Sequence, residues 1–377
     1  MRILVVNAGS SSLKLRVLDD GDRVTCSADL AAPRGEADNA AAGAAIASFG
    51  QVDAAGHRIV HGGTRFTDPV IIDPGVRRQL EALTDLAPLH QPKSLAALDA
   101  VQAALKHRSQ GAVPAVACFD TAFHATIGDA AATYALPAQW RRRWDLRRFG
   151  FHGLSHAYAS RRAAEMLGGD AGALRIVTCH LGAGASLAAV RGGRSADTTM
   201  GFTPLEGLVM ATRSGSVDPG LVLWLEEHVG TPPAELAAAL EHRSGLLGLA
   251  GTADMREIVA RAGGNASGSS GTGPDEAGAR LALHVYLHRL RGSVAAMAAA
   301  MDGLDALVFT GGVGENSPGV RSRAAAGLGF LGVEVDEARN AGPAADREIG
   351  APGAPARVLV IAAREDIEIA RQVRTLM

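Results

Sequence analysis

The sequence is poor in aromatic residues, cysteine and lysine, and it lacks any long apolar run. Phe, Trp and Tyr make up only 4% of the 377 residues, which argues against a surface that stacks nucleic-acid bases on aromatic rings. The three cysteines are widely spaced and form no C-x-x-C pair, so a disulfide framework and a thiolate zinc site are both disfavoured. No apolar run approaches the roughly 18 residues of a membrane span, and the N-terminus becomes polar too early for a signal-peptide core. These absences predict a cytoplasmic protein.

Lysine occurs only at positions 14, 93 and 106, and every other cationic side chain is arginine. A bias in genome composition explains this without any function, but it draws attention to a lysine that falls inside a motif. The formal net charge is −2, so no overall field attracts the chain to nucleic acid or to anionic lipid. We therefore expect neither nucleic acid nor a membrane as a partner.

The length of the chain predicts two domains, and an internal match supports this. A chain of 377 residues exceeds the usual size of a single core, and its 47% of apolar residues is enough for two. Arg2–Gly9 and Arg175–Gly182 align without a gap, each an apolar run that leads into a small-residue turn. A second strand-like run follows each turn, at 13–18 and at 186–190. The match indicates two related domains, although chance similarity between common strand residues would produce it as well.

The rest of the chain alternates between helical and strand-like patterns. Apolar spacing predicts helices at 73–86, 92–107, 153–168, 218–229, 234–242 and 276–301, with a last helix from about Glu365. Short apolar runs predict strands at 52–60, 113–119, 305–310 and 356–361. This alternation is typical of α/β layers. Residues 263–274 are rich in Gly and Ser and are expected to form a loop.

Three Gly-rich segments that follow predicted strands favour a ligand with phosphate groups. They are Asn7–Lys14, His180–Gly184 and Gly311–Asn316. Closely spaced backbone N–H groups in such segments suit phosphate oxygens, and Lys14 adds a cation. An ordinary hairpin turn would explain the first segment alone. No Gly-Lys pair occurs, so a P-loop is absent, and the G-x-G-x-x-G at 327–332 is rejected as a dinucleotide site because no strand is predicted before it.

Two histidine pairs and two arginines complete the motifs read from the residues themselves. His57/His61 and His152/His156 have the i, i+4 spacing, but neither pair carries the adjacent Glu of zinc proteases, which disfavours a metal site of histidines. Arg58 lies on the strand that enters Gly62-Gly63, and Arg213 lies in a Thr-Arg-Ser-Gly turn. Arginine suits a planar carboxylate or a phosphoryl group, although a surface arginine without any role is the alternative for each.

Nine segments resemble those of acetate kinases and occur in the order typical of that family. They cover essentially the whole chain, from near the N-terminus to the last helix. The segments are Asn7–Lys14, His57–Gly63, Phe119–His124, Phe149–His156, His180–Gly184, Thr203–Gly207, Ala211–Gly215, Asp254–Arg256 and Gly311–Asn316.

The resemblance implies an α/β fold of two related domains around a nucleotide cleft, as in the superfamily of acetate and sugar kinases, actin and chaperone ATPases. The last helix is then expected to return to the first domain. That domain would comprise 1–123 plus 367–377, and the second, nucleotide-binding domain would comprise 124–366. A homodimer is implied as well.

The implied activity is the reversible transfer of a phosphoryl group between ATP and acetate, giving ADP and acetyl phosphate, with Mg²⁺ as cofactor and Mn²⁺ able to replace it. One alternative is a propionate or butyrate kinase with a wider pocket. Another, less favoured, is a non-catalytic ATP-binding module like actin or the chaperones. That branch lacks the segments His57–Gly63 and Phe149–His156 in this form.

Carried over by position, the resemblance assigns roles to single residues. Arg58 and Arg213 would bracket the phosphoryl group, His152 would hydrogen-bond it, and Asp120 would be a proton or orientation partner on the carboxylate side. The transition state of phosphoryl transfer is loose, so fixed cations matter more than a protein nucleophile.

The remaining implied residues hold the metal, the nucleotide and the methyl group. Asn7 and Glu365 would hold Mg²⁺, directly or through water. The nucleotide would contact Lys14, His180, Leu181, Gly182, Ala183, Gly184, Asp254, Met255, Arg256, Gly312, Val313, Gly314, Glu315 and Asn316. The methyl pocket would be walled by Val60, Leu89, Phe151 and Pro204, with His90 nearby.

The chain departs from the family pattern at four places. Ala183 replaces a usual Asn, Ala211 a usual Gly, and Arg364 an Asn that commonly precedes the metal-site Glu. The segment 263–274 has the character of an insertion. None of these changes removes a principal cation, so we expect activity to be retained.

Overall fold

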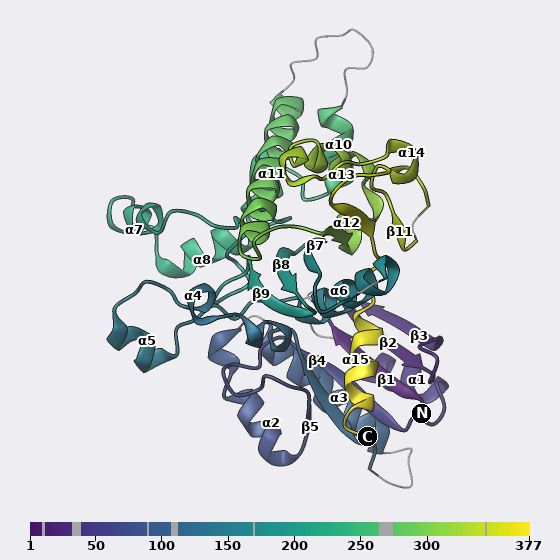
Figure 1. The fold of residues 1–377 in the computed structure, drawn as a ribbon. Coiled ribbons are helices and arrows are strands. Elements are labelled where there is room, and N and C mark those ends of the chain that lie inside the picture. The colour runs from purple at the N-terminus through teal and green to yellow at the C-terminus, as the bar shows by residue number, and fades with distance from the viewer. Residues whose placement is uncertain are drawn as a thin grey trace. The chain divides into compact units, whose positions relative to one another are not determined.

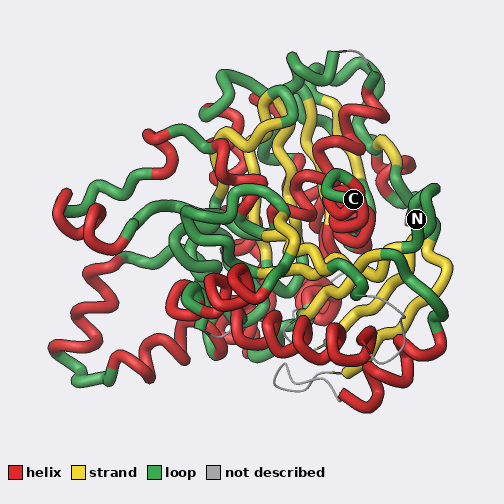
Figure 2. The backbone as a smooth tube through the Cα atoms, turned by 90° about the horizontal axis from the view of Figure 1, so that it is seen from below, coloured by secondary structure: helices red, strands yellow, loops and turns green. Residues whose placement is uncertain are grey.

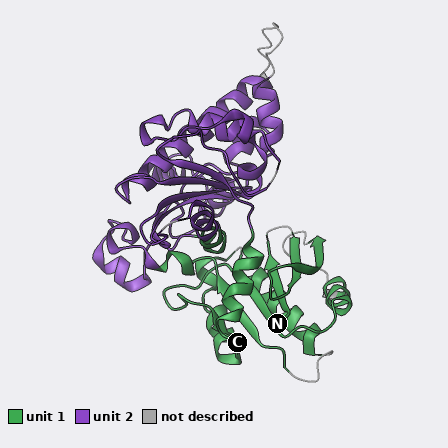
Figure 3. Ribbon diagram, turned by 45° about the vertical axis from the view of Figure 1, so that its right-hand side comes forward, with its two compact units in different colours: residues 1–125, 151–158, 364–377 green, residues 126–150, 159–363 purple. Residues whose placement is uncertain are grey.

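The computed structural model describes residues 1–9, 12–31, 39–88, 90–106, 112–168, 170–263, 274–343 and 345–377. The chain forms two compact units, which Figure 3 shows in different colours. Unit 1 comprises Met1–Ala125, Phe151–Tyr158 and Arg364–Met377, and unit 2 comprises Thr126–Gly150 and Ala159–Ala363. The expected domain boundaries at 123/124 and 366/367 stay a prediction. Leu89 and nearly all of the expected loop at 263–274 lie outside the described residues.

A six-stranded mixed sheet forms the centre of unit 1 (Figure 1). Its strand order is β3-β2-β1-β4-β6-β5. β1 is antiparallel to β2 and parallel to β4, β4 is parallel to β6, and β5 pairs with β6 in the antiparallel sense. The strands are β1 (Ile3–Ala8), β2 (Ser12–Leu18), β3 (Val24–Ala31), β4 (Ala54–Ile59), β5 (Val70–Ile71) and β6 (Ala115–Phe119).

Helices cover both faces of this sheet because successive side chains of a strand point to opposite faces. Leu4 and Val6 of β1 pack with α1 (Asn39–Ser48) and α3 (Gln91–Lys106), whereas Ile3 and Val5 pack with α15 (Glu365–Arg374). The last helix of the chain therefore belongs to the core of the first unit. The remaining helices near this sheet are α2 (Pro74–Glu81), η2 (Thr84–Leu86) and η3 (Ala122–Thr126).

Gly56 of β4 lets α15 approach the sheet closely. A Cβ atom at this position would lie 2.5 Å from Cγ2 of Ile369 and 2.7 Å from Cγ2 of Val373. Any larger residue would push the helix away, and with it Glu365 at the first position of α15. The glycine thus sets the position of one expected metal ligand.

Unit 2 contains a second six-stranded mixed sheet, with the order β11-β12-β10-β7-β8-β9 (strands yellow in Figure 2). β7 is antiparallel to β8 and parallel to β10, β10 is parallel to β12, and β11 pairs with β12 in the antiparallel sense. The strands are β7 (Arg175–Leu181), β8 (Ala185–Arg191), β9 (Arg194–Thr198), β10 (Ala306–Thr310), β11 (Arg347–Glu348) and β12 (Arg357–Val360).

The two sheets match strand for strand and also in register. Ile3 lies opposite Ala54 in the first sheet, and Ile176 lies opposite Ala306 in the second. A backbone contact just before the first strand is repeated as well. The amide of Arg2 donates to Oδ2 of Asp53 at 2.6 Å, and the amide of Arg175 donates to Oδ2 of Asp305 at 2.8 Å.

In both units the aspartate amide also returns a hydrogen bond to the arginine carbonyl, at 2.8 and 2.9 Å. These repeated details confirm the prediction of two related α/β domains.

Helices surround the second sheet, and the long helix α11 (Pro274–Ala299) packs against β7 and β8. α6 (Gly153–Leu167) begins in unit 1 and continues in unit 2. The other helices of unit 2 are α4 (Asp129–Ala132), α5 (Ala138–Trp144), α7 (Pro219–Glu227), α8 (Pro233–His242), α9 (Gly245–Ala250), α10 (Met255–Ala262), α12 (Gly311–Asn316), α13 (Pro318–Ala325), η4 (Gly329–Leu331) and α14 (Glu337–Asn340).

Every predicted strand and helix overlaps an observed element, but the helix expected at 73–86 is divided into α2 and the separate 3-10 helix η2. Two Gly-rich motifs also need comment. Gly311–Asn316, expected to be a turn, forms the short helix α12 directly after β10. The G-x-G-x-x-G at 327–332 follows the helix α13 and contains η4, so the element before it is a helix rather than a strand, as expected. None of the helices in the described ranges is long and apolar enough to cross a membrane. The cytoplasmic location stays a prediction.

Candidate active site

A hydrogen-bonded cluster in unit 1 joins four of the predicted site residues at the ends of its strands. Nε and Nη2 of Arg58, on β4, donate to the carboxylate of Asp120, just after β6, at 2.9 and 2.5 Å. Nη1 of Arg58 lies 3.3 Å from Oδ1 of Asn7 on β1. Nδ2 of Asn7 in turn donates to Oε2 of Glu365 at 2.7 Å. Because β1, β4 and β6 are parallel, their carboxyl ends meet at one edge of the sheet and bring these side chains together.

The electrostatics of this cluster keep Arg58 charged and perturb Asp120. Burial opposes the charge on Arg58, but the carboxylates of Asp120 and Glu365 outweigh it and raise the pKa of Arg58 above its ordinary value. Burial raises the pKa of Asp120, although Arg58 pulls it in the opposite direction. The Asp120 side chain is only 2% exposed, whereas that of Arg58 is 15% exposed. The buried carboxyl group of Asp120 therefore fixes the orientation of the Arg58 guanidinium.

His152 lies close to this cluster in a strained backbone conformation. Its φ is 58°, a left-handed conformation that costs of the order of 1–3 kcal/mol for a residue other than glycine. The amide of the following Gly153 donates to the carbonyl of Asp120 at 2.8 Å, and a Cβ on Gly153 would lie only 2.2 Å from that oxygen. The glycine therefore lets the segment with His152 dock directly on the backbone of Asp120.

Apolar residues expected to wall the methyl pocket are buried beside this segment. Val60 and Phe151 are 6% and 1% exposed. The Phe151 ring meets the ring of buried His61 edge-on, with 5.4 Å between centroids. Burial lowers the pKa of His61 to about 4, so this ring is neutral at neutral pH. The amide of His90 bonds to the carbonyl of Ala87 at 3.0 Å.

Two further predicted residues in unit 1 can be placed. Lys14 lies on β2 opposite Asn7, and its side chain is exposed. Val60 lies one position beyond the observed end of β4. The structure therefore brings Arg58, Asp120, Asn7 and Glu365 into contact, and it places Lys14 on the strand next to them.

Arg213 and Pro204 contact each other in unit 2, as members of one pocket should. Nη1 of Arg213 donates to the carbonyl of Pro204 at 2.9 Å. Burial lowers the pKa of Arg213, and only the more distant Glu241 opposes the shift. Among the described residues no carboxylate forms an ion pair with Arg213, in contrast to Arg58. The charge of Arg213 is therefore compensated less than that of Arg58, which suits it to bind an anion.

The nucleotide residues predicted in unit 2 converge on one cavity of about 420 Å³. Three separate segments supply them: the turn after β7, the first turn of α10, and α12 with the residue that follows it. Eight predicted residues line the cavity, namely Gly182, Ala183, Asp254, Met255, Arg256, Gly312, Val313 and Asn316. His180 and Leu181 end β7, Gly184 completes the turn, and Gly314 and Glu315 lie within α12, but these five residues do not line the cavity.

Four residues of this cavity were missed by the motif reasoning: Leu246, Ala253, Tyr286 and Ser317. Ala253 and Ser317 adjoin predicted residues, so extending each motif by one position would have found them. Leu246 and Tyr286 come from α9 and α11 and belong to no motif. Tyr286 is 3% exposed, and burial raises the pKa of its hydroxyl. Together with Met255 and Val313 they give the cavity an apolar side that suits a flat base.

A buried arginine that the sequence did not single out fixes α12. Arg321 on α13 is fully buried, and its Nη1 donates to the carbonyls of Gly314 and Glu315, each at 2.8 Å. Nε and Nη2 donate to Oδ1 and the carbonyl oxygen of Asn340, at 2.7 and 2.8 Å. The last carbonyls of a helix lack partners within that helix, so Arg321 caps the helix that lines the cavity. Burial lowers the pKa of Arg321 to about 10, which leaves it charged at neutral pH.

Comparison with known proteins agrees with this architecture. A model described as the acetokinase family matches residues 34–371. An acetate kinase of Leifsonia xyli subsp. xyli is 45% identical, over 98% of this chain and 97% of its own length. The crystal structure of Porphyromonas gingivalis acetate kinase superposes with a TM-score of 0.86 at 35% identity, covering 100% of this chain and 99% of that one. A propionate kinase from Francisella tularensis subsp. tularensis reaches the same TM-score at 32% identity, with 98% of each chain covered.

The two matched sheets and these similarities define a phosphotransferase whose acceptor is a carboxyl group. The chain belongs to the acetokinase family.

Proposed function

We propose that this protein transfers the γ-phosphoryl group of ATP to acetate, giving acetyl phosphate and ADP, and that it also catalyses the reverse reaction. The observation that carries the proposal is the cavity of about 420 Å³ in unit 2, because eight residues that the resemblance assigns to the nucleotide line it. A polar side with Asp254, Arg256 and Asn316 and an apolar side with Met255 and Tyr286 suit a nucleotide.

The acceptor needs little activation. A carboxylate is ionised at neutral pH and attacks phosphorus directly, so no base has to remove a proton from it. The loose transition state carries its negative charge on the equatorial oxygens of the phosphoryl group, so the enzyme gains most from fixed cations. Arg58 and Arg213 are the cations we assign to this task.

Different contacts orient Arg58 and Arg213. Asp120 holds the guanidinium of Arg58 through its Nε and Nη2 atoms, which fixes the direction in which the charge is presented. Arg213 donates a hydrogen bond to the carbonyl of Pro204, and its charge is partly desolvated, so its attraction for a bound anion is strong. His152 is proposed to donate a hydrogen bond to the phosphoryl group during transfer. Asp120 is proposed to act by orienting Arg58 or by holding a proton.

The donor set at the edge of the first sheet fits a hard divalent cation. Asn7 and Glu365 offer oxygen atoms from two adjacent side chains, and Mg²⁺ prefers oxygen ligands and keeps several waters. Asn7 and Glu365 are therefore proposed to hold Mg²⁺, directly or through water, with Mn²⁺ as a substitute. When bound, the ion would neutralise charge on the phosphate oxygens of ATP. No group of three or more His, Cys, Asp or Glu that could hold a metal occurs among the described residues.

The acid is proposed to bind with its carboxylate at Arg58 and its alkyl group in a pocket walled by Val60, Leu89, Phe151 and Pro204, with His90 nearby. Acetate is the expected preferred acid, as for the acetate kinases to which the chain is similar. Propionate is the second candidate, because a propionate kinase matches the fold equally well at 32% identity. The volume beside Val60 would decide between the two.

The test is to trap the acyl phosphate product with hydroxylamine after incubation with ATP, Mg²⁺ and either acetate, propionate or butyrate. Acetyl hydroxamate at the highest rate is the expected outcome. Faster formation of the propionyl or butyryl product would shift the assignment to that acid. Absence of any acyl hydroxamate, with ATP still bound, would refute a kinase and favour an ATP-binding module without catalysis.

The homodimer implied by the resemblance is also proposed, and an apolar surface in unit 2 supports it. Five large apolar side chains are exposed on α7 and its flanks: Val217, Leu221, Leu223, Trp224 and Val229. Contiguous exposed apolar residues often mark a protein–protein contact. Light scattering on the purified protein should give the mass of a dimer, and Leu223→Asp should reduce it to that of a monomer. A monomeric wild-type protein would contradict the proposal.

A further inference from the structure

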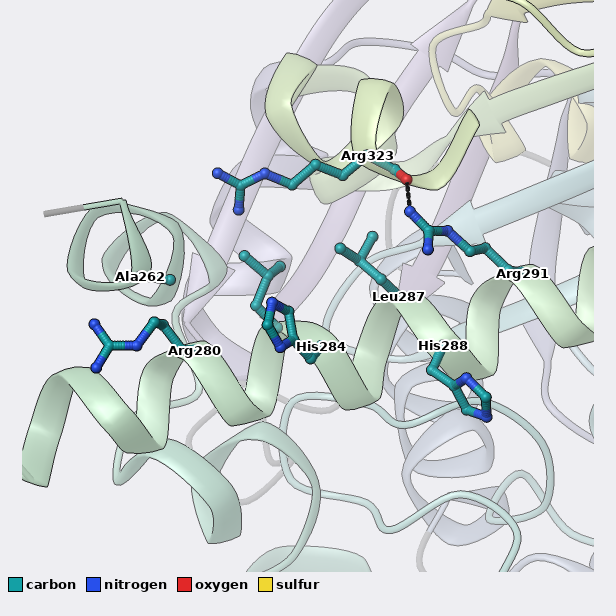
Figure 4. Close-up of a pocket in the computed structure, with 8 residues that line it drawn as sticks. Ala262, Arg280, His284, Leu287, His288, Arg291 and Arg323 are labelled. Carbon is teal, nitrogen blue, oxygen red and sulfur yellow. Dashed lines mark hydrogen bonds between the residues drawn. The ribbon is translucent and has the colours of Figure 1, made fainter. Parts of the chain in front are cut away.

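A second cavity in unit 2 is lined by arginines and histidines that the proposed reaction does not use. It measures about 520 Å³ and lies between the end of α10, one face of α11 and α13 (Figure 4). Arg280, His284, Leu287 and Arg291 recur on α11 at intervals of three or four residues, so they share one face of that helix. The other residues that line the cavity are Ala262, Leu283, His288 and Arg323.

The charge of this cavity is of one sign. None of its lining residues in the described part of the chain is an Asp or a Glu. Among the lining arginines, Arg280 forms an ion pair with Glu276, one turn earlier on α11. Its Nη1 lies 3.8 Å from Oε2 of Glu276, which is longer than a hydrogen bond. Three arginines are permanently charged at neutral pH, and Glu276 is the one carboxylate paired with any of them among the described contacts, so the cavity presents a net positive charge to an anion.

The side chains are arranged to reach such an anion. In Figure 4, Arg280 and His284 rise from α11 on one side, and Arg323 extends from α13 on the other. Arg291 is fixed by its contacts, because its Nη2 donates to the carbonyl of Arg323 and its Nε donates to the carbonyl of Ala324 at 3.3 Å. His288 points away from α13. The candidate ligands are therefore Arg280, His284 and Arg323.

The size and the apolar lining define the class of ligand. A volume of about 520 Å³ falls in the range of small-molecule sites and far exceeds a single inorganic ion. Ala262, Leu283 and Leu287 offer apolar surface between the cationic groups. Arginine forks match phosphate oxygens in bidentate geometry. We propose that this cavity binds a small organic phosphate with a carbon skeleton and at least two negative charges, as a site separate from the nucleotide cavity.

The same three helices also bound the nucleotide cavity, which gives the second site a route to affect the first. Met255 and Arg256 at the start of α10, Tyr286 on α11 and Ser317 just before α13 line the nucleotide cavity. Ala262 and Arg323, near the other ends of α10 and α13, line the basic one. A ligand that changes the spacing of these helices would therefore change nucleotide affinity, and by linkage ATP would change the affinity for that ligand to the same degree.

The experiment uses the full chain and fructose 1,6-bisphosphate as the probe, measured by titration calorimetry in the presence of saturating ADP. ADP occupies the nucleotide cavity, so the probe cannot bind there. The test variant is Arg280→Ala/Arg323→Ala. The matched control is Arg289→Ala, which removes an exposed arginine of α11 that does not line the cavity.

We expect one probe site in the wild-type protein, binding at least about tenfold weaker in the double variant and unchanged in the control, since losing one charge-assisted contact is worth about a factor of ten. Kinase activity without the probe should be equal in all three proteins, which shows that the variants fold. No binding by wild type at about 10 mM probe would overturn the inference, and so would equal weakening in variant and control. Because the readout is binding, failure of the kinase assignment would be seen separately, in the hydroxamate assay.

Discussion

Replacing Arg321 by methionine should destabilise unit 2 and weaken ATP binding more than it slows turnover. Methionine roughly preserves the length of the side chain but removes all five donors. The change leaves the carbonyls of Gly314 and Glu315, at the end of α12, without their capping partner, and it leaves Asn340 without two hydrogen bonds. A buried acceptor without a donor costs about 1–3 kcal/mol.

The expected magnitude follows from these contacts. Four hydrogen bonds are lost, but removal of the buried charge also ends its desolvation cost, so we expect a net loss of about 3 kcal/mol in the free energy of unfolding. For a unit of this size each kcal/mol lowers Tm by about 2–4 °C. The variant should therefore melt about 6–12 °C below the wild type.

Scanning calorimetry with and without ADP measures the stability, and steady-state kinetics separates KM for ATP from kcat. Arg323→Met is the matched control because it lies on the same helix, is exposed and donates no hydrogen bond among the described contacts. A Tm within about 2 °C of that control would refute the stabilising role. A lower Tm with unchanged KM for ATP would refute the positioning of α12. Arg321→Lys should restore only part of both losses, since an ammonium group cannot span both partners as a fork does.

Arg58→Ala and Arg213→Ala should each lower kcat by about 10²-fold or more, and a near-normal steady-state rate in either variant would remove that arginine from the transition state. Glu365→Gln should raise the Mg²⁺ concentration needed for half-maximal activity, whereas an unchanged Mg²⁺ titration would place the metal on another carboxylate. Val60→Ala should shift the ratio of kcat/KM for propionate over acetate upward, by about tenfold or more, because a methylene in such a pocket is worth about 1–3 kcal/mol; a constant ratio would show that Val60 does not wall the pocket. Burial lowers the pKa of His124 from 6.5 to about 4, so the unfolded chain binds more protons between these values and the free energy of unfolding should fall as pH decreases from 6.5 toward 4. Urea midpoints that are equal at about pH 7 and pH 5 would contradict this.

The strands and helices with strong apolar patterns were predictable, and the weaker ones were not. β1 and β7 are continuous apolar runs, and both were found from the sequence. β3 was missed because only alternate residues are partly covered and none is fully buried, which leaves little apolar signal. α12 was taken for a turn because three of its six residues are glycine, a poor helix former. Tertiary contacts from Arg321 override that propensity.

The candidate site shows the same division between local and tertiary information. Gly182, Asp254 and Gly312 were named from motifs, and the fold brings all three to one cavity. Tyr286 lies on an apolar stripe of α11, and helical spacing predicts that it is buried but not which cavity it reaches. Arg321 looks like a surface residue in the sequence, because its partner Asn340 comes from a distant helix. Motifs therefore locate residues that line the cavity, whereas the residues that hold these motifs in place, such as Arg321, are recognised only from coordinates.

The matched registers of the two sheets have a consequence for substitution experiments, because each sheet serves as an internal reference for the other. By register, Arg58 of the first sheet corresponds to Thr310 of the second. Asp120 corresponds in the same way to Ala363.

The chain therefore already contains a sheet of the same topology in which the ion pair of Arg58 and Asp120 is replaced by small uncharged residues, and that sheet folds. The contact between Arg2 and Asp53, in contrast, recurs at the second sheet. This sheet topology therefore does not require the ion pair of Arg58 and Asp120, because the second sheet has small uncharged residues at both positions. The repeated contact, in contrast, belongs to the architecture common to both sheets.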